Sequence, residues 1–328
     1  MKVLFLHDDH REPGQGGGAE SILRDVSAGL RKRGHTVEWW YGQVPLADMV
    51  TRFQPDICNV QTVHTRFGMH PLLYLQRNHI PHVLVLMDYW PFCGPRMLLD
   101  KDNLSCAAVS GVCDGQCGAQ PAPALIRETV NKSVVVVLAQ TTREIYERNG
   151  IRVDAAIGCG IDTEFFKPDP AKRQWGAVIT SSAWPEYQTK GMHILQAAAE
   201  RIGVKVRLVA HVTRAELRDA LQEASIYVFP STYEETWGLC LTEAMASGLA
   251  CIASNVTGPR AQIADGVNGI LFENRNVDDL AGKLRQLIDE PAEQQRLGWA
   301  AREWAVKRAN IDVVAERYER LYKAVLNE

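Results

Sequence analysis

Short apolar segments alternate with helical patterns along the whole chain, and this alternation limits its possible folds more than any other feature. In the first half, the runs KVLFLH, TVEWWY, DICNV, HVLVLM and VVVVLA are separated by longer stretches, one of which has a helical pattern from about Ala19 to Arg33. Apolar strands with helices between them are typical of a parallel sheet that is covered on both faces. The sequence therefore predicts an α/β protein.

The same pattern begins again after residue 160. The runs WGAVIT, KVRLVA, SIYVFP, ACIAS and GILF alternate with helical patterns, and the segment GCGIDTEFFKPDP, rich in Gly and Pro, precedes them as a natural linker. A chain of 328 residues is also long enough for two domains. We therefore expect one doubly wound domain over 1–160, a second over 161–310, and a final helix within 311–328.

Composition limits the possible partners. The net charge of −3 gives no general signal for nucleic-acid binding, although a local basic patch is compatible with it. The N-terminal run MKVLFLH is too short for a signal peptide, and no later apolar run approaches membrane-spanning length. These observations predict a soluble cytoplasmic protein.

Two carboxylates stand out in the stretch YEETWGLCLTEAMASGLACIAS. Strand SIYVFP runs to Pro230, a loop carries Glu235, a helix begins near Gly238 and holds Glu243, and Gly248 ends it. In doubly wound sheets, ligands bind beyond the carboxyl ends of the strands, where helix N-termini supply N–H donors. The pair predicts a site for an anion that carries hydroxyl groups, although acidic residues near a helix N-terminus also occur simply because they complement the helix dipole.

The motifs around this pair resemble those of a known family. EETWGLCLTEAMASGLACIAS, followed by GPRAQIADGVNGILFE, resembles the Glu-x7-Glu signature and the glycine-rich segment of the GT-B retaining glycosyltransferases of family 4, the glycosyl transferases group 1. GGGAES, HVLVLMDYW, GCGIDTEFF and TKG occur in the order that this family shows. The resemblance implies two Rossmann-like domains facing a cleft, with the acceptor on the first, the nucleotide sugar on the second, and the last helix crossing back to the first.

The resemblance also implies roles for individual residues. Glu235 would contact hydroxyls of the transferred sugar, Glu243 the ribose of the nucleotide, and Lys190 in TKG the diphosphate, although a solvated lysine is the plainer alternative for the last. The backbone around the diphosphate and sugar would be that of Thr236, Trp237, Gly238 and Leu239, and Arg260 would be a further candidate for binding the phosphates.

The first domain supplies the remaining candidates. Gly16, Gly17 and Gly18 in GQGGGAES follow the first strand and would let a ligand approach a helix N-terminus, unless they form a plain turn. His64, at a strand end, would face the acceptor or donor sugar, unless it is structural.

Two departures from the family pattern also concern the site. Asp88 follows Met87, where relatives carry a His–Asp pair, and it joins the catalytic candidates. The stretch SSAWPEYQ before Lys190 has no Arg, although members usually carry one there.

The implied reaction is transfer of a sugar from a nucleotide sugar to a glycan, lipid-linked or small acceptor, with net retention by front-face attack. Such a route needs stabilisation of the leaving group rather than a nucleophilic carboxylate, and it needs no divalent metal. A sugar-nucleotide-binding protein with decayed catalysis and a GT-B nucleotide-sugar 2-epimerase are the alternatives. The nucleotide base, the oligomeric state and peripheral attachment to the inner membrane face stay open.

Four cysteines lie close together in CGPRMLLDKDNLSCAAVSGVCDGQC. Cys93, Cys106, Cys113 and Cys117 could bind a structural zinc ion or an iron–sulfur cluster, because four thiolates suit either. Free thiols are the second possibility, and disulfides are a third in a reducing compartment. The loop over 93–117 is expected on the acceptor side.

Overall fold

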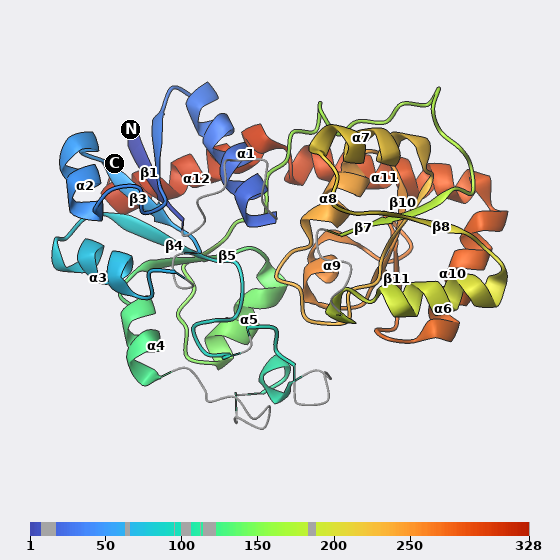
Figure 1. Cartoon of the computed structure of the whole chain (residues 1–328), viewed down its shortest axis with the longest axis horizontal. Helices are drawn as coiled ribbons and strands as arrows, with labels where there is room; N and C mark the ends of the chain where they lie inside the picture. Colours follow the sequence, from blue (N-terminus) through green and yellow to red (C-terminus); the bar gives the residue numbers. More distant parts are fainter. Residues whose placement is uncertain are drawn as a thin grey trace. The chain divides into compact units, whose positions relative to one another are not determined.

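The computed structural model describes residues 1–7, 18–62, 66–94, 96–99, 106–111, 113, 123–182 and 188–327. It divides into two compact units, one formed by Met1–Gly160 with Ile311–Glu328 and the other by Ile161–Asn310 (Figure 1). Each unit is a parallel sheet with helices, as the alternating sequence pattern predicts. No described helix combines the length and the hydropathy needed to cross a bilayer.

The sheet of the first unit has the strand order β2-β1-β3-β4-β5-β6, and every pair is parallel. Its strands are β1 (Lys2–Leu6), β2 (Thr36–Trp40), β3 (Ile57–Val60), β4 (His82–Leu86), β5 (Val134–Val137) and β6 (Ala155–Ala156). Its helices are α1 (Gly18–Lys32), α2 (Leu46–Phe53), α3 (His70–Arg77), the short 3₁₀ helix η1 (Ala107–Val109), α4 (Ala124–Val130), α5 (Gln140–Arg148) and α12 (Ile311–Leu326). The sequence did not predict β6, because two residues are too few to show a pattern.

The second unit has the strand order β11-β10-β9-β7-β8, again all parallel. The strands are β7 (Val178–Ser181), β8 (Val206–Val209), β9 (Ile226–Phe229), β10 (Ala250–Ser254) and β11 (Ile270–Phe272). The helices are η2 (Gln188–Lys190), α6 (Met192–Ile202), α7 (Arg214–Glu223), α8 (Leu239–Ala246), α9 (Thr257–Gln262), α10 (Val277–Asp289) and α11 (Pro291–Arg308). Helix α7 begins at Thr213, whose side chain and that of Glu216 form a capping box.

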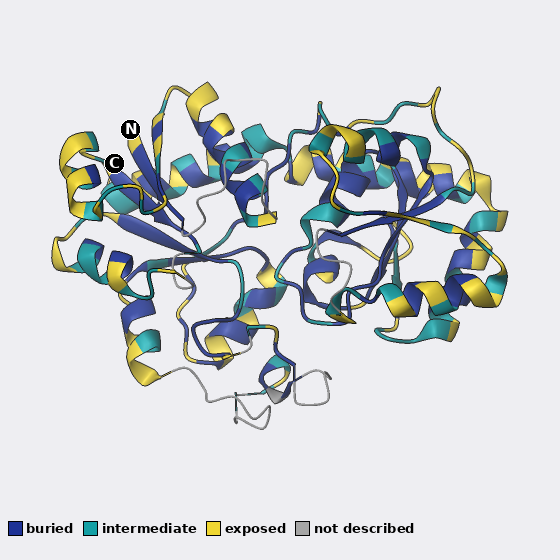
Figure 2. Ribbon diagram, in the orientation of Figure 1, coloured by how far each residue is buried: buried dark blue, intermediate teal, exposed yellow. Residues whose placement is uncertain are grey.

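In both units the central strands are buried, whereas the helices expose one face (Figure 2). This is the burial expected of helices packed on a parallel sheet.

The last helix packs on the first unit, as the expected fold requires. In Figure 1 α12 lies beside α1, and two glycines allow the close approach, since a Cβ on Gly29 would lie 2.8 Å from the Ala315 Cβ and one on Gly160 would lie 3.0 Å from the Val314 Cβ. A buried hydrogen bond of 2.6 Å from the Asn59 side chain to the Tyr322 hydroxyl joins the helix to β3. The helix is thus held by shape as well as by polar contacts.

Charged contacts add to this docking at the surface. Glu319 lies 2.5 Å from Arg33 and 2.9 Å from Lys323, and Lys32 pairs with Asp312 at 2.6 Å. Lys323 and Arg33 lower the pKa of Glu319 to about 2. The carboxylate therefore stays ionised, although exposed pairs of this kind stabilise a fold only modestly.

Gly29→Ala should destabilise the protein, although alanine favours a helix over glycine by about 0.5–1 kcal/mol. Its new methyl group would clash with Ala315 across the α1–α12 contact, and overpacking of this kind costs about 1–3 kcal/mol. The matched control is Gly282→Ala in α10, where a Cβ has nothing within 4 Å. Thermal denaturation of both variants should show a lower midpoint for the first and an unchanged or higher midpoint for the second. An equal rise in both would contradict the close helix contact.

Candidate active site

The candidate site of the second unit lies where its strand order reverses. β7 is followed in sequence by β8 on one side, while β9, β10 and β11 extend the sheet on the other. In open doubly wound sheets, ligands bind beyond the carboxyl ends of the strands at this switch point. The segments that follow β7 and β9 carry Lys190 and Glu235, so both residues belong to the segments that leave the sheet at this point.

Lys190 and Glu235 form the centre of a hydrogen-bonded cluster. The Lys190 ammonium donates to Glu235 Oε1 at 2.8 Å and to the Tyr233 hydroxyl at 3.1 Å. Tyr233 in turn donates to Glu235 Oε2 at 2.6 Å, and the Ser231 hydroxyl donates to Oε1 at 3.0 Å. Lys190 also lies over the Tyr233 ring, 4.8 Å from its centroid. Three donors therefore fix the orientation of the Glu235 carboxylate.

The electrostatics of the cluster favour an ion pair. Burial alone would lower the pKa of Lys190, but Glu235 and Tyr233 more than offset it and raise that pKa above its usual range. Burial, together with Glu235, raises the pKa of Tyr233, so its hydroxyl stays protonated and remains a donor. Because the Lys190 ammonium has three N–H groups and uses two on these partners, the third can serve a bound anion.

The two loops that carry this cluster are joined by their backbones. The Thr232 N–H donates to the Thr189 carbonyl at 2.8 Å, and the Ser231 hydroxyl oxygen lies 3.2 Å from the same carbonyl oxygen. Gly191 has a φ of +69°, and a Cβ there would lie 1.8 Å from the Pro230 carbonyl oxygen. Only glycine fits this position, so the TKG motif has a structural reason for its last residue.

The loop before α8 is held against α9. The Trp237 indole N–H donates to the Thr242 hydroxyl at 2.8 Å, and the Gln262 side chain donates to the Trp237 carbonyl at 2.7 Å. Gly238 caps α8 with a φ of +99°, which a residue with a Cβ rarely adopts. The segment from Thr236 to Leu239 thus has a fixed backbone at a helix N-terminus, a suitable arrangement for binding an anion.

Glu243 lies in the second turn of α8 and is only 5% exposed. Its charge reaches the thiol of Cys240, whose pKa is raised to about 12 by burial first and then by Glu243, against the opposing effect of Lys190. Glu235 acts on the same thiol, and Ser181 at the end of β7 is hydrogen-bonded to it. Cys240 therefore lies within reach of both carboxylates and of the ammonium, and it is not the pure core residue that its apolar context indicates.

Three residues of this site were not among the sequence candidates. Ser231 and Tyr233 orient Glu235, and their positions on the same loop, four and two residues before the acid, are the signal that the sequence carries for them. The third, Glu234, is buried but points elsewhere, since its carboxylate accepts from the Thr257 N–H at 2.8 Å and from the Thr257 hydroxyl. It stabilises the start of α9, while Glu235 faces Lys190.

Arg260 lies on α9 and is exposed. No hydrogen bond or ion pair joins it to the Lys190–Glu235 cluster, although its helix holds the Trp237 loop through Gln262. Its role toward a phosphate stays a prediction.

The carboxyl edge of the first unit holds the other candidates. The Asp88 carboxylate accepts from the Trp90 N–H at 2.9 Å, and its carbonyl accepts from the Tyr146 hydroxyl at 2.8 Å, so its turn is well fixed. Gly18 begins α1, whereas Gly16, Gly17 and His64 lie outside the described residues. Just after β3, Gln61 is 1% exposed, and its Oε1 has no hydrogen-bond partner among the described residues.

The expected metal site is not supported. Among the described residues, no group of three or more His, Cys, Asp or Glu side chains could hold a metal ion, and Cys117 lies outside those residues. Cys93 and Cys106 are buried in the apolar core of the first unit, with Cys113 packed against it. Burial raises the pKa of Cys93, and Cys106 and Cys113 add to this, which favours neutral thiols. No disulfide joins any two of these three cysteines.

Part of the second unit is similar to known glycosyltransferases. Residues 188–304 match the model of the glycosyl transferases group 1. A D-inositol 3-phosphate glycosyltransferase of Nocardiopsis dassonvillei is 39% identical over 114 residues, which are 34% of this chain and 26% of the relative. A glycogen synthase of Mycobacterium tuberculosis is 33% identical over 129 residues, which are 39% and 31% of the two chains. The match thus spans about a quarter to a third of these relatives.

Solved structures resemble the chain over its whole length. A sucrose-phosphate synthase from Thermosynechococcus elongatus has a TM-score of 0.75 at 15% identity and covers 99% of both chains. Anabaena Alr3699/HepE in complex with UDP-glucose has a TM-score of 0.72 at 18% identity and covers 99% of this chain and 100% of its own. These likenesses show the GT-B fold with two Rossmann-like domains. Residues 188–304, which lie in the second unit, are thus similar to the glycosyl transferases group 1.

Proposed function

We propose that this protein is a retaining glycosyltransferase that moves a sugar from a nucleotide-sugar donor to an acceptor. In this proposal the second unit holds the donor and the first unit holds the acceptor. The observation that carries it is the Lys190–Glu235 pair at the switch point of the second sheet, next to the fixed N-terminus of α8. An ammonium and helix N–H groups suit a diphosphate, and a neighbouring carboxylate suits sugar hydroxyls.

The chemistry follows from these groups. As the bond from the sugar to the diphosphate breaks, negative charge grows on the leaving oxygen, and the third N–H of Lys190 together with the backbone donors of Thr236 to Leu239 would stabilise it. Glu235 already accepts from three groups, which leaves its Oε2 one acceptor site for a sugar hydroxyl. It positions the sugar and does not attack it, because the lysine ammonium holds it as an ion pair. Glu243 would bind the ribose.

The first unit would present the acceptor at its carboxyl edge, near Asp88 and Gln61. The unpartnered Oε1 of Gln61 can accept from a hydroxyl that enters there. The glycine-rich segment, Gly16 to Gly18, and His64 belong to the same proposal by resemblance. A cytoplasmic location remains a prediction.

The test is a titration of the purified protein with UDP, GDP, ADP, TDP and CMP and their common sugar conjugates, read by calorimetry. Uridine nucleotides come first because a solved structural neighbour holds UDP-glucose. We expect one base to bind and its sugar conjugate to be hydrolysed slowly in the absence of an acceptor, equally well in EDTA. Binding without any release of the nucleoside diphosphate, even with acceptors supplied, would contradict the enzyme and favour a sugar-nucleotide-binding protein. Binding of none would contradict both.

A further inference from the structure

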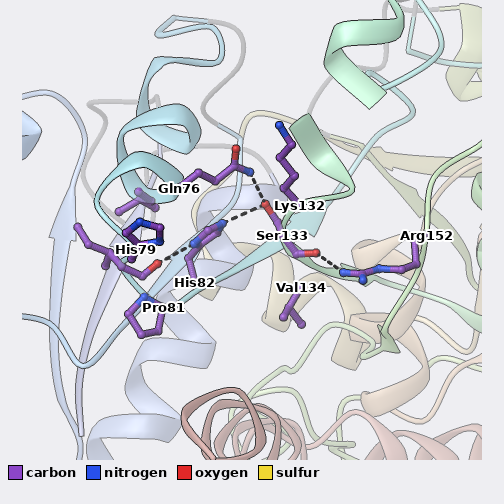
Figure 3. Close-up of a pocket in the computed structure, with 10 residues that line it drawn as sticks. Gln76, His79, Pro81, His82, Lys132, Ser133, Val134 and Arg152 are labelled. Carbon is purple, nitrogen blue, oxygen red and sulfur yellow. Dashed lines mark hydrogen bonds between the residues drawn. The ribbon is translucent and has the colours of Figure 1, made fainter. Parts of the chain in front are cut away.

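A pocket of about 420 Å³ lies in the first unit, at the end of the sheet opposite to the candidate acceptor edge (Figure 3). His82 and Val134, the first residues of β4 and β5, line it together with Ser133 and the residues that follow α3. Ligands of doubly wound sheets bind at the carboxyl ends of the strands, so the proposed transfer reaction has no use for a pocket at the amino ends. It therefore needs its own explanation.

A series of hydrogen bonds connects Gln76, Ser133, His82 and Ile80, which line this pocket (Figure 3). Burial lowers the pKa of His82, against the opposing effect of its bond to the Ile80 carbonyl, so the ring is neutral. Since a carbonyl only accepts, Nδ1 carries the proton and donates to Ile80 at 2.8 Å, and Nε2 accepts from the Ser133 hydroxyl at 3.0 Å. Ser133 in turn accepts from the Gln76 amide at 3.1 Å. Because these groups hydrogen-bond to one another, a ligand must be bound by other side chains of the pocket.

Three basic side chains, Lys132, Arg152 and His79, line the pocket and can bind a ligand; we call them its rim. The exposed side chains of Lys132 and His79 have no partner among the described residues, and both line the pocket. Arg152 donates through one nitrogen to the Ser133 carbonyl at 2.8 Å and to Asp154 at 3.2 Å, which leaves other N–H groups of its guanidinium for a ligand. None of the described residues that line the pocket carries a carboxylate. Lys132 and Arg152 therefore place positive charge on the rim, and the Asp154 carboxylate offsets part of that of Arg152.

We propose that this pocket binds a phosphate group carried on a small organic molecule or on a lipid. A lysine point charge and an arginine fork on one rim are the side chains that proteins use for phosphate, and Leu75, Pro81 and Val134 give the pocket an apolar side for the part that bears it. The proposal is independent of the transfer reaction, because it uses none of the residues assigned to that reaction.

The test is a calorimetric titration of the full chain with inorganic phosphate and glycerol 3-phosphate, together with sedimentation on phosphatidylcholine vesicles with and without phosphatidylglycerol. The key variant is Lys132→Gln with Arg152→Gln, and Lys205→Gln, an exposed lysine of the second unit, is the matched control. Lys190→Ala separates this pocket from the donor site, which would also attract phosphate.

We expect binding that survives Lys190→Ala and Lys205→Gln but weakens about tenfold or more in the double variant, the loss typical of charge-assisted hydrogen bonds. His79→Gly is a second pocket variant, which can be tested if the double variant folds poorly. The φ of His79 is +53°, which glycine adopts freely, so this variant should keep its melting temperature and still bind more weakly.

If the double variant loses binding of inorganic phosphate or glycerol 3-phosphate, the ligand is a soluble phosphate compound. If it loses only sedimentation with the vesicles that contain phosphatidylglycerol, the ligand is a lipid headgroup. Equal affinity of the unchanged protein and both pocket variants for every probe, or no binding of any probe by the unchanged protein, would overturn the proposal.

Discussion

Lys190→Ala should lower the rate of sugar transfer by roughly 100- to 1,000-fold in kcat, the loss seen when one preorganised donor to a developing negative charge is removed. The ammonium lies 2.8 Å from Glu235 and is the cation of the candidate site, so the change removes the charge that would stabilise the departing diphosphate. It also leaves the nearly buried Glu235 carboxylate without its counter-ion. The effect should fall mainly on kcat, since the stabilised charge develops in the transition state.

Initial rates of nucleoside diphosphate release, measured beside thermal denaturation, check this expectation. Lys205→Ala serves as the control for loss of an exposed lysine in the same unit. Tyr233→Phe removes one hydrogen bond to Glu235 but keeps the ion pair, so it should cost much less than Lys190→Ala. A folded Lys190→Ala protein with a kcat within a few fold of the unchanged protein would remove Lys190 from the reaction.

The regular elements could be predicted from the sequence because they follow from periodicity. The final helix, expected within 311–328, runs from Ile311 to Leu326, and the helix expected over Ala19 to Arg33 runs from Gly18 to Lys32. The strands could be predicted from short continuous apolar runs, because strands that are buried on both faces carry apolar residues at successive positions.

The glutamates show why the site was harder to predict. Glu234 and Glu235 are neighbours with the same chemistry, but the loop turns sharply between them, since the Glu235 N–H donates to the Tyr233 carbonyl at 2.8 Å. One therefore reaches Thr257 and the other Lys190. The motif singled out Glu235, which pairs with Lys190, whereas the contacts of Ser231 and Tyr233 depend on how the loop turns after β9.

The prediction of a metal site in the cysteine loop was not supported, for a related reason. Spacing along the chain indicated a metal site, but Cys93 and Cys106 lie in a core where a thiolate is costly. The phosphate pocket had no sequence signal, because Lys132 and His79 come from segments about fifty residues apart that only the parallel sheet brings together.

Burial also explains how the second carboxylate can recognise a ligand. Glu243 is inside a helix and almost inaccessible, and burial, followed by the charge of Glu243, raises the pKa of the neighbouring Cys240 thiol. An ionised acceptor in such surroundings gains more from a hydroxyl than it would in water, because the effective dielectric constant is low. This favours a bidentate contact with a diol such as a ribose.

Glu243→Ala should therefore weaken binding of the nucleotide by about 1.5–3 kcal/mol, or roughly 10- to 150-fold in Kd. The free nucleoside diphosphate and the sugar conjugate should lose the same factor, because the proposed contact is to the ribose that both share. Calorimetric titration of both ligands measures this, with Glu200→Ala, an exposed acid on α6, as the control. A larger loss for the sugar conjugate than for the diphosphate would move Glu243 to the sugar. Unchanged affinity in a variant that melts as the unchanged protein does would refute its placement in the site.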